Sequence, residues 1–250
     1  MKYIYETHLH TREGSRCGRV HGEDYIPYMI EKGYSGMVVT DHFFTGNCAV
    51  PHFDPWEVRV DKYMSGYERA LKATRGSDFT VLFGIEYNFE CDEYLIYGVD
   101  RKWLLDRPDI ERMTREEVYS EVHKSGAIMV QAHPYRERDY ISNIHLTPSV
   151  CDGIEIYNAA NSDNMNALAY EYSKRLNLPV TAGSDIHYFH DGPMGGMAFD
   201  RKITTISDFA DAIRNREGTP VMLGEEIVPV TDIPSLLSPV DKPSLPVIMH

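Results

Sequence analysis

Short apolar runs alternate along the chain with longer amphipathic stretches. The apolar runs predict seven strands, over residues 3–9, 36–42, 80–89, 93–100, 127–133, 153–158 and 179–185. The amphipathic stretches predict helices over residues 22–33, 55–75, 114–126, 164–177 and 207–218. Strands that are apolar nearly throughout and alternate with helices are typical of parallel sheets covered by helices. The pattern therefore predicts an α/β fold, and about seven such units favour a (β/α) barrel over an open doubly wound sheet.

Two of the predicted helices carry clear end signals. Thr114 is followed three residues later by Glu117, which is the spacing of a capping box, and this helix is expected to end at Gly126. The last helix is expected to end at Gly218. The stretch over residues 191–197, "DGPMGGM", is predicted as a surface turn, with a lid as the alternative.

The end of the chain is rich in proline. Residues 225–250 contain prolines at positions 229, 234, 239, 243 and 246, which exclude a regular helix or a central strand. We therefore expect a barrel domain over residues 1–224 and an extended tail over residues 225–250. This tail either packs on the barrel or extends from it.

Composition limits the possible environments of the protein. The 250 residues suit one large α/β domain, and the hydrophobic share of 42% and charged share of 25% are ordinary for a globular protein. No apolar run approaches the ~20 residues that cross a bilayer, and the chain does not start with the pattern of a secretory signal. Four cysteines lie far apart without a C-x-x-C pair, which favours reduced thiols. We expect a cytoplasmic protein without a membrane partner.

Charge argues against nucleic acid as a partner. The formal net charge is −13, and so acidic a chain repels phosphodiester backbones. The sequence also lacks the G-x-G-x-x-G and G-x-x-x-x-G-K-[ST] loops that cradle nucleotide phosphates. Abundant carboxylates and eleven histidines instead suit a site built around cations.

Residues able to bind metals recur where the predicted strands end, which is where barrel enzymes place their active sites. They are His8, His10, Asp41, His42, Glu86, His133, Glu155, Asp185 and His187. Each alone has an ordinary explanation, such as a hydrogen-bonded core histidine, a helix cap or a carboxylate paired with arginine. Together they favour a metal site, because unpaired buried charges cost several kcal/mol each and a shared cation cluster offsets that cost for all of them.

The ordered motifs H-x-H, D-H, G-x-E, H-P and G-S-D-x-H, over residues 3 to about 190, resemble those of the PHP family, the polymerase and histidinol phosphatase domain. The resemblance implies a distorted (β/α)7 TIM-like barrel with a metal site at the C-terminal ends of the strands. It also implies two or three divalent ions of zinc, manganese or iron. Many members of this family hydrolyse phosphate esters.

The resemblance also implies which residues would hold each metal. The first site would use His8, His10, Glu86 and Asp185, the second Glu86 and His133, and the third His42 and His187. Glu93 stands where the family often has a histidine, and glutamate is a harder ligand that suits manganese or iron. The usual Asp or His after H-x-H is missing from "TREGSRCG". Arg16 cannot bind a cation, which leaves Cys17, Glu13 and His21 as alternatives there.

Such a site would activate a water and clamp the oxygens of a phosphoester. Asp185 and His187 are then the candidates to supply a proton to the leaving oxygen. Arg136, in "HPYRER", is the favoured phosphate contact, with a surface ion pair to Glu137 or Asp139 as the alternative. Arg16 is a further candidate for substrate binding, and Asn158 is expected to hydrogen-bond either the substrate or the groups that hold the metal ligands.

Three functions fit these features. The leading hypothesis is a metal-dependent phosphoric ester hydrolase that acts on a small phosphorylated metabolite (a phosphomonoester). A variant of it would act on phosphotyrosine in proteins. The first alternative keeps the metals but hydrolyses C–N bonds, as the amidohydrolase barrels that also open with H-x-H do. The second is a non-catalytic, metal-binding regulatory PHP domain, against which the nearly complete ligand set argues.

Overall fold

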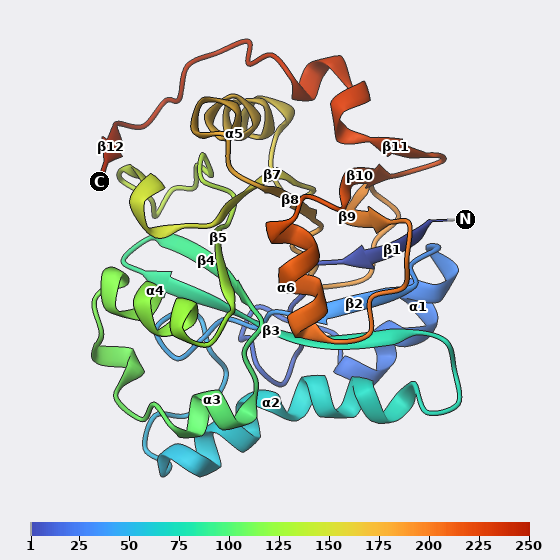
Figure 1. Ribbon diagram of the computed structural model, residues 1–250, viewed down its shortest axis with the longest axis vertical. Coiled ribbons are helices and arrows are strands. Elements are labelled where there is room, and N and C mark those ends of the chain that lie inside the picture. The colour runs from blue at the N-terminus through green and yellow to red at the C-terminus, as the bar shows by residue number, and fades with distance from the viewer. Residues whose placement is uncertain (1) are drawn as a thin grey trace.

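The computed structural model of the chain describes residues 2–250, which form a mixed α/β fold around one curled ten-strand sheet (Figure 1). The sheet order is β11-β10-β9-β1-β2-β3-β4-β5-β7-β8. Its strands are β1 (Tyr3–Glu6), β2 (Gly36–Val39), β3 (Thr80–Phe89), β4 (Asp92–Tyr97), β5 (Ile128–Gln131), β7 (Gly153–Asn158), β8 (Val180–Gly183), β9 (Met194–Phe199), β10 (Thr219–Leu223) and β11 (Ile227–Pro229). A second sheet pairs β6 (Ile144–Leu146) with β12 (Val247–Met249).

Helices surround this sheet, and all five predicted helical segments are present. The helices are α1 (Tyr25–Glu31), α2 (Trp56–Ala73), α3 (Arg101–Leu105), α4 (Arg115–Lys124), α5 (Asp163–Leu176) and α6 (Ile206–Arg214). The predicted capping box of α4 is confirmed. The Thr114 hydroxyl accepts from the Glu117 N–H at 3.3 Å, and the Glu117 carboxylate accepts from the Thr114 N–H at 2.8 Å. Among the described residues, no helix is both long and apolar enough to span a membrane.

Each of the seven predicted strands corresponds to a strand of the sheet, but they are not all parallel as expected. Strand β4 runs antiparallel to both β3 and β5, whereas β1, β2 and β3 are parallel to one another. The reason is the connection, because only Glu90 and Cys91 separate β3 from β4. Two residues can close a hairpin, but a parallel crossover needs a dozen or more residues.

The curl of the sheet brings the end of β8 beside the end of β1. Leu9 and Ile186 form an isolated parallel bridge, in which the His10 N–H donates to the Ile186 carbonyl at 2.9 Å and the Ile186 N–H donates to the His8 carbonyl at 3.2 Å. The segments that follow these two strands therefore meet at one end of the sheet. Both segments carry metal-capable residues of the sequence.

The prediction of a surface turn over residues 191–197 is partly wrong, because Met194–Phe199 forms the buried strand β9. This strand pairs antiparallel with β1 and β10. Its glycines allow close packing: a Cβ on Gly195 would lie 2.3 Å from the Gly183 carbonyl oxygen. Glycine therefore marks a backbone contact here rather than a turn.

The tail packs on the domain rather than extending from it. Strand β11 adds to the sheet edge, two short 3₁₀ turns follow, and β12 pairs in parallel with β6 (red in Figure 1, passing over α5). Asn164 on α5 accepts from the N–H groups of Val240 and Asp241 at 2.9 and 3.0 Å. The division of the chain into domains at residue 224 stays a prediction.

We predict that Gly195→Ala lowers the free energy of unfolding by about 1–3 kcal/mol, because the new methyl group would push β9 away from β8. Urea denaturation monitored by circular dichroism measures this change. Gly224→Ala is the matched control, since a Cβ there meets nothing within 4 Å. Equal stability of the two variants would contradict the close packing of these strands.

Candidate metal centre

Polar residues gather where β1, β2, β5 and β8 end, next to the middle of the β3–β4 hairpin. Strand β1 ends at Glu6, earlier than predicted, so that His8 and His10 lie on the segment that pairs with Ile186. His42 follows β2 and bridges to Glu86 of β3, His133 follows β5, and Asp185 and His187 follow β8. The structure thus brings together the predicted metal-binding residues, His8, His10, His42, Glu86, Glu93, His133, Asp185 and His187.

Glu86 lies at the centre of this group and is fully buried. One carboxylate oxygen, Oε1, is 3.0 Å from His8 Nε2 and 3.2 Å from His133 Nε2. The other, Oε2, is 2.7 Å from His42 Nδ1 and 3.3 Å from His10 Nε2. One carboxylate is therefore shared among four imidazoles.

Asp185 closes the opposite side of the group. Its Oδ1 is 3.2 Å from His10 Nε2 and 3.5 Å from His8 Nε2, while its Oδ2 accepts from Arg136 Nη1 at 2.7 Å. Asp185 and His133 have positive φ values of 55° and 27°, which non-glycine residues rarely adopt. Strained backbone of this kind is found at functional sites, where the surrounding structure holds it in place.

The atoms of this group fit divalent cations better than they fit one another. His8 Nε2, His10 Nε2, His42 Nδ1 and Glu86 Oε2 are buried without a well-formed hydrogen bond, although each lies within 3.5 Å of another polar atom. Their atoms form four sets of three, each set within 4.8 Å: His10–His42–His187, His8–Glu86–His133, His8–His10–Asp185 and His42–Glu86–Glu93. Imidazole and carboxylate are the ligands of zinc, manganese and iron sites.

Glu155 holds two of the histidines from behind. Its carboxylate accepts from His8 Nδ1 at 2.9 Å, from the His133 N–H at 2.9 Å and from Asn158 Nδ2 at 3.0 Å. This contact protonates His8 on Nδ1 and leaves Nε2 free for a metal. Asn158, expected to contact either the substrate or the groups that hold the metal ligands, is fully buried behind Glu155.

A second buried carboxylate orients His10 through a serine. The Ser15 hydroxyl donates to Asp41 Oδ1 at 2.7 Å, so it must accept from His10 Nδ1 at 3.0 Å and from the His42 N–H at 3.0 Å. His10 is therefore protonated on Nδ1 and presents Nε2 to Glu86 and Asp185. Sequence reasoning missed the role of Ser15, because nothing in its spacing links it to Asp41.

Glu6 joins the ends of β1 and β8 beneath the centre. Its Oε1 accepts from the N–H groups of Thr7, His8 and Ser184, each at 2.9 Å. Burial raises the pKa of Glu6 to about 7, against the lowering effect of hydrogen bonds from Ser184 and His8. Sequence reasoning missed this residue too, although a glutamate in an otherwise apolar strand was the available signal.

The electrostatics favour ionised Glu86 and Asp185, whereas burial and the charge of Glu86 raise the pKa of Glu93. Burial acts to raise the pKa of Glu86, but the charges of His42, His8 and His10 hold it well below its usual range. The pKa of Asp185 is likewise lowered, against burial, chiefly by Arg136. Burial acts to lower the pKa of His8, yet Glu155, Glu86 and Asp185 raise it well above the ordinary value. Without a cation, His8 therefore carries a proton that metal binding must displace.

The stretch after H-x-H places its candidate ligands differently. Glu13 pairs with His21 at 2.6 Å and with Arg69 at 3.2 Å. The Arg16 side chain is exposed, and the structure gives it no ion pair. Burial acts to raise the pKa of the Cys17 thiol, but the rings of His187 and His42 lower it to about 6.

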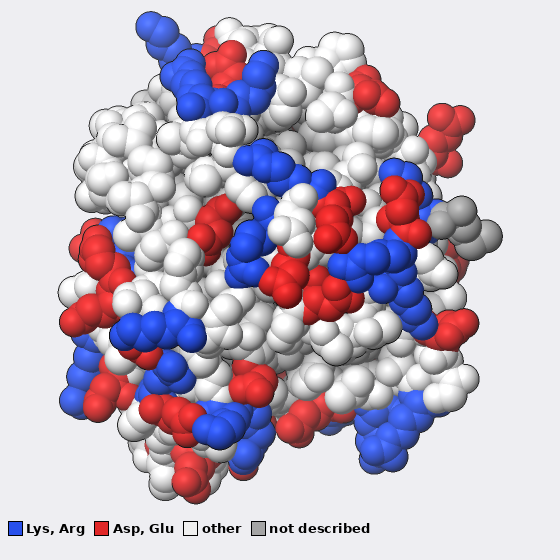
Figure 2. Space-filling view, viewed as in Figure 1, with Lys and Arg blue, Asp and Glu red and all other residues white. Residues whose placement is uncertain are grey.

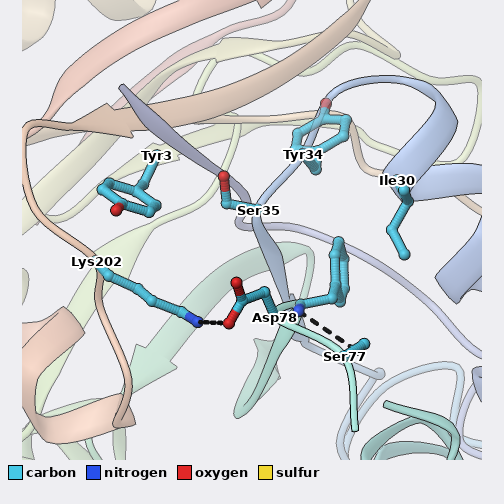
Figure 3. A pocket seen from close by; sticks show the side chains of 8 residues that line it. Tyr3, Ile30, Tyr34, Ser35, Ser77, Asp78 and Lys202 are labelled. Carbon is cyan, nitrogen blue, oxygen red and sulfur yellow. Dashed lines mark hydrogen bonds and ion pairs between the residues drawn. The ribbon is translucent and has the colours of Figure 1, made fainter. Parts of the chain in front are cut away.

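Two cavities adjoin the centre. One of about 370 Å³ is lined by Asp185, His187 and Tyr188, and a much smaller one is lined by Glu93, His133 and Arg136. A separate cavity of about 510 Å³ opens at the other end of β1, where Lys202 and Asp78 pair at 3.3 Å (Figure 3). It lies at the N-terminal ends of β1, β2 and β3, away from the cluster.

We predict that Glu155→Gln weakens zinc binding by about 10–100-fold, because the amide cannot hold His8 and the His133 backbone as the carboxylate does. Competition with a chromogenic chelator measures the dissociation constant. Glu225→Gln, at an exposed position, is the control and should bind zinc like the unmodified chain. An unchanged dissociation constant in Glu155→Gln would show that Glu155 does not orient the ligands.

Comparison with known proteins gives one family match and several structural relatives. A family model described as PHP-associated matches residues 164–217, which include Asp185 and His187. A search of curated proteins found no match.

The fold resembles that of a two-domain protein from Bacteroides vulgatus described as containing a predicted PHP-like metal-dependent phosphoesterase (TM-score 0.65, 14% identity). It also resembles an amidohydrolase from Chromobacterium violaceum (TM-score 0.53, 15% identity) and a lesion-specific endonuclease from Pyrococcus furiosus (TM-score 0.53, 14% identity). These matches cover 91%, 84% and 86% of this chain, and 66%, 96% and 56% of the respective proteins.

At these identities the structural likeness shows a shared fold, and the relatives carry different activities on it. The family match adds the segment that holds Asp185 and His187. The family match covers residues 164–217, and the ordered motifs from His8 to His187 resemble those of PHP proteins.

Proposed function

We propose that the protein is a metal-dependent phosphoesterase that hydrolyses a small phosphomonoester. The observation that carries this proposal is the sharing of the Glu86 carboxylate among four histidines, since a carboxylate placed in this way can bridge two cations. Two or three bound divalent ions would lower the pKa of a water and bind phosphoryl oxygens. The chain's own residues then have to hold the ligands, bind the phosphate and supply a proton.

The proposed ligand sets follow the distances. The first cation would be held by His8, His10, Glu86 and Asp185, whose facing atoms lie 3.0–3.5 Å apart, and the second by Glu86, Glu93 and His133. Glu93 Oε2 is 3.5 Å from His133 Nε2, which supports its place in the second set. We expect zinc, manganese or iron. The curl of the sheet and the Leu9–Ile186 bridge also support the distorted (β/α)7 barrel of seven strands that the family resemblance implies.

Arg136 is the proposed phosphate contact. Its Nη1 is bound to Asp185, while its Nε is buried without a partner. The side chain also lines the small cavity next to Glu93 and His133. An arginine held by a carboxylate on one side can direct its remaining N–H groups at a phosphate oxygen. Arg16 is exposed, and no contact of its side chain supports a similar role.

Asp185 and His187 differ in their fitness to supply a proton. Both oxygens of Asp185 are engaged, one by Arg136 and the other by His10 and His8. His187 lines the larger cavity, and its Nδ1 donates to the Asp185 carbonyl at 2.8 Å, which leaves Nε2 free. Of the two, His187 is the better placed to act on a bound substrate.

The substrate is proposed to be a small metabolite rather than a nucleic acid or a membrane lipid. The net charge of −13 supports this choice. On the face seen in Figure 2, basic and acidic side chains occur in small mixed groups. Arg201, for example, lies between Asp208 and Glu217, at 2.7 and 2.9 Å from their oxygens.

Hydrolysis of C–N bonds is the second candidate. It is favoured by the shared fold with the Chromobacterium violaceum amidohydrolase. The two candidates use the same ligands and differ in whether a phosphate-binding arginine is required. Assays of p-nitrophenyl phosphate and of an N-acyl amino acid, on the same preparation, decide between them.

We predict that the purified protein contains two to three equivalents of divalent metal and that chelation lowers p-nitrophenyl phosphate hydrolysis roughly 100-fold or more. Bound metals stabilise the transition state by several kcal/mol, and about 1.4 kcal/mol corresponds to tenfold in rate. His10→Ala should have a similar effect, whereas His123→Ala, on the exposed side of α4, should not. Elemental analysis finding less than one equivalent in metal-replete protein would contradict the metal centre.

We predict that Arg136→Gln lowers kcat/KM by roughly 10- to 150-fold. This range corresponds to the loss of a hydrogen bond to a charged group, which contributes about 1.5–3 kcal/mol. The loss should appear mainly as a higher KM, with the metal content unchanged. Arg138→Gln is the control, since Arg138 bonds to the backbone carbonyls of Glu137 and Ala160. Loss of metal in Arg136→Gln would mean that Arg136 acts only by holding Asp185.

A further inference from the structure

The segment that carries Arg136 has no regular secondary structure of its own. Residues 132–143 connect β5 to β6 without forming a helix or a strand. Within the segment, the Arg136 N–H donates to the His133 carbonyl at 2.9 Å. The Ile141 N–H donates to the Arg138 carbonyl at the same distance. Two turns of this kind leave the position of the segment dependent on contacts with other parts of the chain.

The C-terminal tail supplies one of these contacts directly. The Ser244 N–H donates to Glu137 Oε1 at 2.7 Å, and the Ser244 hydroxyl donates to Glu137 Oε2. Glu137 is therefore bound through both oxygens, one residue after Arg136. Arg136 itself binds Asp185 and not Glu137. Leu245, which follows Ser244, is partly buried and packs against a hydrophobic core cluster, so this part of the tail is itself anchored.

Strand β12 braces the far end of the same segment. It pairs in parallel with β6, and the Ile144 N–H donates to the Pro246 carbonyl at 2.8 Å. The tail is also tied to α5 before it reaches Glu137, because Asn164 Nδ2 donates to the Asp241 carbonyl at 3.1 Å in addition to the two bonds that Asn164 accepts. The tail therefore crosses from α5 to β6 and contacts the segment at two places.

The braced segment forms part of the wall of the small cavity next to the metal centre. Ile141, Ile144 and His145 line this cavity together with Glu93 and Arg136. Its volume of about 20 Å³ is enough for about one water molecule. A phosphate that meets Arg136 therefore finds no room for its leaving group on this side, as long as the segment stays in place.

We propose that the C-terminal tail is a strap that positions the Arg136 segment through Ser244 and Glu137 and keeps the small cavity closed. The inference rests on the proposed function and adds a limit on its substrates. Arg136 binds the phosphate from a fixed position, and the leaving group has room only in the cavity of about 370 Å³ at His187 and Tyr188. Ser244 and Glu137 are positioning residues in this scheme, because neither lines either cavity.

Kinetics of variants in the strap contact test the proposal. Glu137→Ala and Ser244→Ala should each raise KM for p-nitrophenyl phosphate roughly 2- to 10-fold, the range of one hydrogen bond, with kcat and metal content nearly unchanged. Ser244→Thr keeps a hydroxyl and should behave like the unmodified chain. The double variant should be no worse than Glu137→Ala alone, because the Ser244 hydroxyl makes its bond to Glu137.

A bulkier substrate tests the limit on the leaving group. The ratio of kcat/KM for p-nitrophenyl phosphate to that for phenolphthalein monophosphate should fall roughly threefold or more in Glu137→Ala, because the loosened segment opens the small cavity. Asp139→Ala and Ser238→Ala are the matched controls and should leave both KM and this ratio unchanged. Both residues are exposed, and within residues 2–250 the structure gives neither side chain a hydrogen bond or an ion pair.

Hydrogen exchange followed by mass spectrometry gives a readout that needs no substrate. The amide of Ile144, which donates to the tail, and the amide of Ile141 should exchange several times faster in Glu137→Ala than in the unmodified chain. Asp139→Ala should exchange at these amides like the unmodified chain.

Several results would overturn the strap. These are unchanged exchange at both amides in Glu137→Ala, an unchanged KM in both single variants, or losses that multiply in the double variant. Failure of the proposed function has a different appearance, because the unmodified protein would then not hydrolyse p-nitrophenyl phosphate. In that case the exchange measurement still decides whether Ser244 and Glu137 hold the segment.

Discussion

The buried carboxylate of Glu86 is the constraint on which the site depends. It lies on the third strand of the sheet, fully removed from water, with four imidazoles within 3.3 Å of its oxygens. A buried charge of this kind is expensive unless it is paired. The pairing falls to protonated imidazoles, such as that of His8, or to cations that displace their protons. Cations placed between the carboxylate and the rings would satisfy both kinds of ligand at once, which fits the three buried imidazole nitrogens that form no well-formed hydrogen bond.

The groups behind the histidines also indicate that the centre needs positive charge. Glu155 and the Asp41–Ser15 pair accept from the Nδ1 atoms of His8 and His10, so that both rings turn Nε2 towards Glu86. Glu6, Asp41 and Glu155 add three more carboxylates that are at most 2% exposed. Arg136, which bonds Asp185, is the nearby cationic side chain that the structure shows. Of these carboxylates, Glu86 and Asp185 have lowered pKa values, and their charge depends on Arg136 and on protonated imidazoles or the cations that would replace those protons.

Much of this arrangement could be predicted from the sequence, and the failures have identifiable causes. Apolar periodicity located seven strands and five helices, because burial on both faces leaves a clear pattern. The strand β4 was predicted, but its antiparallel direction was overlooked, although the short gap before Asp92 excludes a crossover. Strand β9 was missed because its glycines and methionines lack the β-branched residues typical of strands. Ser15 and Glu6 took roles set by contacts between distant segments, which local spacing does not encode.

The remaining step concerns how the site would distinguish its metals. Glu93, where PHP proteins often have histidine, would add a hard oxygen ligand on the side of His133. The first proposed set places the imidazoles of His8 and His10 beside Asp185. The two sets would therefore differ in ligand hardness. Because ligand hardness and geometry, more than raw affinity, decide which metal a site keeps, the set with Glu93 would favour manganese or iron over zinc.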